Sequence, residues 1–138
     1  MKYPKEDLIT YRIKRARESF NSAKLLAENG FHLESISRLY YACFYMVLAL
    51  LLKENLVTNS HTGARRLLGL HFIKTGKITV ENGKLFSLLF DQRMKSDYED
   101  FIKLPTGQTA LLINNVDQFI KNIEALDYLF NDVHSTYH

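Results

Sequence analysis

The residues of this sequence best suited to hold an anion are Arg38 and Arg93, the second of which begins the segment RMKSDY. Arg93 and Asp97 lie four positions apart in the segment RMKSDY, so on a helix their side chains are surface neighbours. They form either a salt bridge within the helix or a pair in which Asp97 orients Arg93 toward a cleft, where its guanidinium meets phosphate. Arg38 borders an otherwise apolar stretch, and its charge must reach solvent or find a partner such as Asp97 or Glu34.

Histidines that could exchange protons stand elsewhere in the chain. His71 follows Arg66 by five positions, which places the two side chains about 140° apart on a regular helix. We therefore expect His71, beside Leu70 and Phe72, to be a half-buried structural histidine rather than the catalytic partner of an arginine. His61 is expected either to cap the helix that follows it or to lie at the mouth of a cleft.

The stretch between Arg38 and Lys53 has the composition of a core helix. It contains 14 consecutive uncharged residues, LYYACFYMVLALLL, whereas a membrane span needs about 20 apolar residues. A helix that is apolar all round belongs at the centre of a bundle or in an oligomer interface. Its tyrosines are expected to be mainly core aromatics, with one available to stack on a base; they are Tyr40, Tyr41 and Tyr45.

Helical periodicity dominates the chain, and proline and glycine mark where the helices end. The expected helices run from about Lys5 to Asn29, Leu33 to Glu54, His61 or Thr62 to Lys74, Lys84 onward, and Gln108 to Asn131. Ser60 or Thr62 is expected to cap the third helix and Thr106 the last. Short connections force antiparallel neighbours, so the sequence predicts an all-α, antiparallel up-and-down four-helix bundle with an additional short helix. Residues 1–138 are expected to form one domain, with 132–138 a frayed tail.

The formal net charge of +3 is mildly basic and does not by itself indicate nucleic-acid binding. A basic cluster near the start of the chain either attracts phosphates or forms a solvated helix face; it comprises Arg12, Lys14, Arg15 and Arg17. Cys43 is the only cysteine, so no internal disulfide can form. The polar start, MKYPKEDLIT, is not a secretory signal, and we expect a cytoplasmic protein that does not bind membranes.

Several known catalytic patterns are absent from the sequence. It has no glycine-rich phosphate loop, no cysteine and histidine cluster with zinc spacing, and no HExxH. It also has no ExxH repeat of the kind that binds two metal ions in helical bundles. We therefore expect neither a metal site nor a cofactor.

Three segments in this order resemble the small stand-alone members of the HEPN-domain family. They are SRLYYACF at the start of the second helix, a later HTG segment, and RMKSDY. The resemblance covers about Lys5 to Leu129 and implies a helical bundle that often dimerises. It also implies a minimal nucleotidyltransferase as partner, within a toxin–antitoxin or defence system. Some members are metal-independent RNases, in which an arginine holds the scissile phosphate and a histidine four to six residues later moves protons.

This chain departs from that catalytic pattern, because Tyr98 stands where the histidine would follow Arg93. A tyrosine with a pKa of about 10 is a poor base at neutral pH, which weighs against RNase activity and favours nucleotide or RNA binding. The expected phosphate-binding residues are Arg38, Arg93, Asp97, Tyr98, Tyr41 and His61, in a polar cleft that a homodimer could complete. One alternative is an active RNase in which Arg93 works with His71 or His61 from another helix. A third is a purely structural interaction protein.

Overall fold

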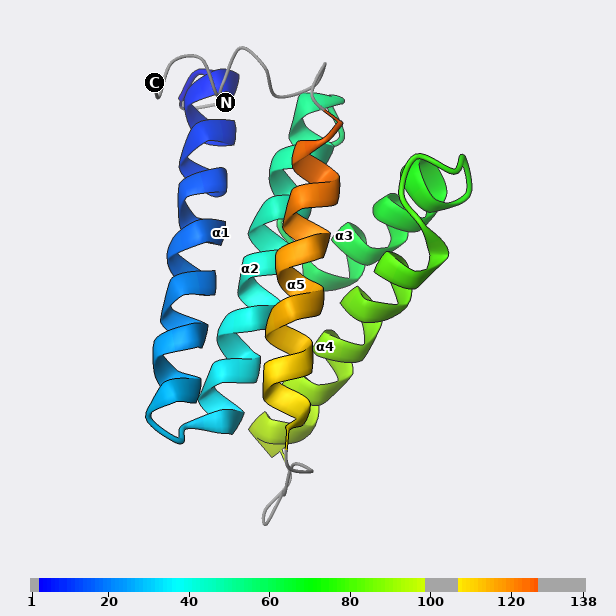
Figure 1. Ribbon diagram of the computed structural model, residues 1–138. Helices are drawn as coiled ribbons and strands as arrows, with labels where there is room; N and C mark the ends of the chain where they lie inside the picture. Colours follow the sequence, from blue (N-terminus) through cyan, green and yellow to red (C-terminus); the bar gives the residue numbers. More distant parts are fainter. Residues whose placement is uncertain (1–2, 99–106, 127–138) are drawn as a thin grey trace.

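The computed structural model describes residues 3–98 and 107–126, and at Asp97 and Tyr98 it describes the backbone alone. Its elements are α1 (Lys5–Glu28), α2 (His32–Lys53), α3 (His61–Leu68), a π-helical turn (Gly69–Ile73), α4 (Val80–Tyr98) and α5 (Gln108–Glu124). Figure 1 shows α1, α2 and α5 side by side, with α3 and α4 as a hairpin beside them. The predicted all-α bundle of four long helices and one short helix is confirmed, and the described residues contain no strand.

The central helix is α2, which packs against α1, α3, α4 and α5. It is long and apolar enough to cross a membrane by length and composition alone, but 78% of its most apolar window is buried inside the protein. Other helices therefore cover the apolar surface that the uncharged stretch presents, and its hydropathy is that of a core helix. Cys43 is fully buried there, as expected for a small core residue.

A tight turn joins α1 to α2 and fixes how the two helices pair. Gly30 has a φ of 83°, in the left-handed region that glycine adopts without a Cβ clash, and Phe31 N–H then donates to the Leu26 carbonyl. On α2, the buried Ser35 hydroxyl donates to the Ala23 carbonyl at 2.7 Å. The buried face of α1 comprises Ile9, Ile13, Ala16, Ser19 and Ala23. Tyr11 lies outside this face and is 54% exposed.

The start of α3 is fixed by a hydroxyl cap. Ser60 Oγ accepts a hydrogen bond from Gly63 N–H at 2.9 Å, so Ser60 rather than Thr62 is the N-cap. A Cβ at Gly63 would lie 2.6 Å from Ser60 Oγ and 2.4 Å from Thr58 Oγ1. Glycine is therefore needed for the approach of the cap, and this explains the HTG segment, in which His61 is the first residue of the helix.

Loss of this cap should have a measurable effect on stability. Ser60→Ala is expected to lower the free energy of unfolding by about 1 kcal/mol, because the Gly63 N–H loses its partner. Thr62→Ala, two positions away on an exposed residue, is the matched control and should change it by less than about 0.5 kcal/mol. Urea denaturation followed by circular dichroism measures both. Equal effects of the two substitutions would contradict the assignment of Ser60 as the cap.

The end of the third helix differs from the expected regular helix. It finishes in a π turn, closed by a hydrogen bond from Lys74 N–H to the Gly69 carbonyl. Phe72 is buried, whereas Leu70 and His71 are exposed. The expectation of a half-buried His71 was wrong, because Leu68 and Phe72, four positions apart, take the core-facing places and His71 points outward between them.

Two predicted boundaries of the last helices also differ. We expected α4 to begin near Lys84, but it begins at Val80, where the Thr79 hydroxyl accepts a hydrogen bond from Asn82 N–H at 3.1 Å. The last helix, α5, begins after Gly107 as expected but ends at Glu124, not Asn131. The proposed cap Thr106 and the tail 132–138 lie outside the described residues.

Candidate functional site

A cluster of aromatic rings joins α2, α3 and α4 on one side of the bundle. Tyr40 is fully buried, and its ring lies parallel to those of Phe44 and Phe86, with centroids 5.8 and 5.7 Å away. The His61 ring stacks on Phe44 at 4.4 Å, and the Phe90 ring meets Tyr40 edge-on at 5.9 Å. Packing of α3 and α4 onto α2 therefore places His61 in the middle of this cluster.

A short hydrogen bond ties His61 to the core. The Tyr40 hydroxyl lies 2.6 Å from His61 Nδ1. Burial, and then the positive charge of Arg93, lower the pKa of His61, so the imidazole is neutral at neutral pH. Burial also raises the pKa of Tyr40, which keeps the phenol protonated. When His61 Nδ1–H donates to the Tyr40 oxygen, its other ring nitrogen is left with the lone pair that a base needs.

Guanidinium groups surround these rings. The Arg93 guanidinium carbon lies 5.2 Å from the Tyr41 ring centroid and 5.8 Å from that of Tyr40. The Arg38 guanidinium carbon lies 4.8 Å from the same Tyr41 ring, and both arginines are half-buried. Arg65, one turn after His61, lies over the Phe90 ring at 5.1 Å. Cations held against aromatic faces keep their N–H donors oriented, and several together create the positive potential that attracts an anion.

We call the group made of Arg38, Tyr40, Tyr41, His61 and Arg93 the Arg93 site. The structure brings together four of the residues expected to bind phosphate, namely Arg38, Arg93, Tyr41 and His61. The side chains of Asp97 and Tyr98, the other two, lie outside the described residues. The sequence grouped Tyr40 with Tyr41 and Tyr45 as mainly core aromatics, one of which could stack on a base, and did not indicate a contact with His61. That contact carries no sequence signal, because the two residues are joined by tertiary packing.

His71 does not belong to the Arg93 site. It is exposed on the π turn, ten residues after His61. His61 shares its surroundings with Arg93, because the His61 ring and the Arg93 guanidinium both contact the rings of Tyr40 and Tyr41. Among the described residues, no three side chains of the metal-binding types gather closely enough to hold a metal ion.

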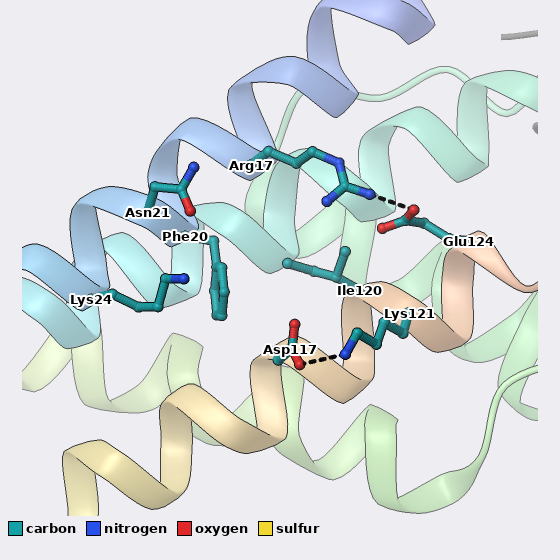
Figure 2. A pocket seen from close by; sticks show the side chains of 8 residues that line it. All are labelled: Arg17, Phe20, Asn21, Lys24, Asp117, Ile120, Lys121 and Glu124. Atoms are coloured by element: carbon teal, nitrogen blue, oxygen red, sulfur yellow. Dashed lines mark hydrogen bonds and ion pairs between the residues drawn. The ribbon is translucent and has the colours of Figure 1, made fainter. Parts of the chain in front are cut away.

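Figure 2 shows a hollow of about 330 Å³ between α1 and α5, away from the Arg93 site. Two of the three cations that line it are paired with carboxylates of the same hollow. Arg17 pairs with Glu124, and Lys121 pairs with Asp117 at 2.9 Å. Lys24 lies 5.1 Å from the Phe20 ring. Because Arg17 and Lys121 already face carboxylates, little positive charge is left in this hollow to attract a phosphate.

The fold and the site together define a small helical bundle with a cationic, aromatic-lined patch that includes a histidine. The chain matches the HEPN domain family over residues 9–132 and belongs to it. The predicted resemblance is confirmed.

Relatives of this chain include proteins named UPF0332 and proteins named putative toxins. It is 36% identical over 122 residues to a "UPF0332 protein" of Thermotoga maritima, a match that covers 88% of this chain and 92% of the relative. It is 33% identical over 113 residues to "Putative toxin MJ0605" of Methanocaldococcus jannaschii, covering 81% and 83%. A second protein of that organism, "Putative toxin MJ0142", is 28% identical over 108 residues, covering 78% and 74%.

Proposed function

We propose that this HEPN protein binds the phosphate groups of RNA or a nucleotide at the Arg93 site, as the helical component of a toxin–antitoxin or defence system. The observation that carries the proposal is the position of two guanidinium groups, those of Arg38 and Arg93, over one Tyr41 ring. Their guanidinium carbons lie 4.8 and 5.2 Å from the centroid of that ring, so both positive charges act on the same part of the surface and favour the binding of a phosphate there. The toxin names of two relatives favour the same class of system.

The proposal further includes a minimal nucleotidyltransferase as partner, a homodimeric state and a cytoplasmic location. Copurification of the tagged chain with such an enzyme encoded beside it tests the partner. Sedimentation of the purified chain tests the dimer.

A binding experiment tests the Arg93 site. The probe is UpU carrying 2′-O-methyl groups, which cannot be cleaved through the 2′-hydroxyl, and binding is followed by NMR titration. Arg93→Gln is expected to weaken binding by about tenfold or more, since a hydrogen bond to a charged group contributes about 1.5–3 kcal/mol. Arg66→Gln, which removes the same charge from an exposed position on α3, should leave the affinity unchanged. Equal affinities for the two variants would refute the site.

A second function, metal-independent RNA cleavage, is favoured by one specific contact. His61 is hydrogen-bonded to Tyr40 and lies under the influence of the Arg93 charge, so a base and a phosphate-binding cation come from two different helices. Proton transfer by His61 at the 2′-hydroxyl would replace the histidine that is missing after Arg93. The experiment that separates cleavage from binding is argued in the Discussion.

A further inference from the structure

A line of alternating aromatic rings and guanidinium groups continues from the Arg93 site along α2 toward α1. Tyr41 and Tyr45 are four positions apart on α2, and their ring centroids lie 6.2 Å apart. Both rings are half-buried, so each presents an edge or face to solvent. We call the line formed by Tyr41, Tyr45, Arg15 and Arg12 the α2 ridge.

Two arginines of α1 lie at the end of this ridge that is away from the Arg93 site. The Arg15 guanidinium carbon lies 5.3 Å from the Tyr45 ring centroid, and Arg15 Nη2 donates to the Tyr45 hydroxyl at 3.4 Å. Arg12, one turn earlier on α1, reaches the Leu48 carbonyl at 3.4 Å. Glu18 is the acidic group on α1 whose charge acts on Arg15. Arg15 Nε is a buried donor with no hydrogen-bond partner among the described residues, an uncommon state for a buried polar atom.

The dimensions of the ridge suit a polymer better than a single nucleotide. From Tyr41 to Leu48 the axis of α2 advances by about 10 Å at 1.5 Å per residue. That span corresponds to about three nucleotides of a stacked strand. Proteins that bind single strands combine basic grooves with aromatic side chains on which successive bases stack, and the ridge supplies both.

We propose that the ligand of this protein is single-stranded RNA several nucleotides long, with one phosphate at the Arg93 site and the following nucleotides along the α2 ridge. This inference rests on the proposed function, because it takes the Arg93 site as the point where the strand begins. The bases stack on Tyr45 and the phosphates meet Arg15 and Arg12. A duplex is excluded from this mode of binding because its bases are already stacked and paired.

The test compares a long and a short probe. Fluorescence anisotropy would follow a labelled 2′-O-methyl oligouridylate of about eight nucleotides, a length within the usual range of single-strand sites. NMR titration would follow 2′-O-methyl UpU. Tyr45→Ala and Arg15→Gln are expected to weaken binding of the long probe by about tenfold, in line with about 1–3 kcal/mol per stacked base. Neither should change the affinity for UpU by as much as twofold.

Matched variants separate the ridge from general electrostatics and from loss of structure. Arg17→Gln removes the same charge from the same helix, on the side facing α5, and should leave binding of the long probe near the wild-type value. Tyr45→Phe keeps the ring and should do the same. Loss of long-probe binding in Arg17→Gln equal to that in Arg15→Gln would overturn the ridge.

The two probes also separate failure of the ridge from failure of the Arg93 site. If the wild type binds UpU but gains no affinity with length, the ridge is wrong and the Arg93 site stands. If it binds neither probe, both proposals fail. Sedimentation of Tyr45→Ala and Arg15→Gln identifies the other use of such a surface: conversion of a dimer to a monomer would show that the ridge is an interface between copies, and would overturn the RNA assignment.

Discussion

Replacing Tyr40 with alanine is expected to lower the free energy of unfolding by about 3–5 kcal/mol, the cost of removing a large aromatic ring from a packed core. Tyr40 is fully buried, and its ring lies against Phe44, Phe86 and Phe90 as well as His61. Its removal leaves a cavity where α2, α3 and α4 meet and takes away the hydrogen-bond partner of His61. Urea denaturation followed by circular dichroism gives the difference.

Two controls locate the effect in the ring. Tyr40→Phe keeps the packing and loses one hydroxyl, so it should cost about 1 kcal/mol. Tyr11→Ala deletes the same side chain from a position that is 54% exposed, and should cost less than about 0.5 kcal/mol. A Tyr40→Ala protein no less stable than Tyr40→Phe would contradict the view that this ring holds the three helices together.

The size of this effect determines which variants are useful for functional work. Domains of this size are stable by about 5–15 kcal/mol, so Tyr40→Ala would remove a large part of the total. Tyr40→Phe leaves the bundle intact and breaks only the contact to His61, so it tests the orientation of the imidazole without unfolding the site. The stabilising role of Tyr40 and its effect on His61 are thus separable by experiment.

The fold was predictable because its main determinant is local in the sequence. The uncharged stretch of α2 must be buried on all sides, and the periodic segments before and after it form the four helices that bury it. The predictions were wrong where a single contact decides a helix boundary or the orientation of a side chain. Because the Thr79 hydroxyl caps it, α4 begins four residues before the predicted start, and because Leu68 and Phe72 face the core, His71 faces solvent.

The candidate site was predictable only in part, for a physical reason. The sequence alone predicts Arg38 and Arg93 as phosphate-binding residues, because Arg38 borders the uncharged stretch and Arg93 begins the segment RMKSDY. The contact between Tyr40 and His61 depends on how α3 is placed after the connection from Glu54 to Ser60, and composition carries no information about that placement. The ridge through Tyr45 and Arg15 depends likewise on the register of α1 against α2.

The second prediction concerns His61 and RNA cleavage. If the protein cleaves RNA, His61→Gln should lower the rate by about 10²- to 10⁴-fold, the usual contribution of a general acid or base. His71→Gln should leave the rate unchanged, since His71 is exposed on the π turn outside the Arg93 site. The assay is cleavage of an unmodified oligouridylate by purified protein with a metal chelator present.

The pH dependence gives this prediction a second readout. Burial and the charge of Arg93 hold the pKa of His61 below the ordinary value of about 6.5, so the base form is already complete at neutral pH. The rate should therefore rise with pH only below that value and then level off. Arg93→Gln removes one of the two causes, so it should raise the pKa of His61 and move the rise in rate to higher pH. NMR titration of the His61 ring measures the same shift directly.

The lowered pKa of His61 also makes the stability of the protein depend on pH. Neutral His61 contributes its full stability above pH about 6.5, and this contribution is lost as the pH falls through the pKa of His61 in the folded protein.

Unchanged cleavage in His61→Gln would exclude His61 as the base. Loss of cleavage with the affinity for UpU intact would separate the chemical role of His61 from the binding role of Arg93.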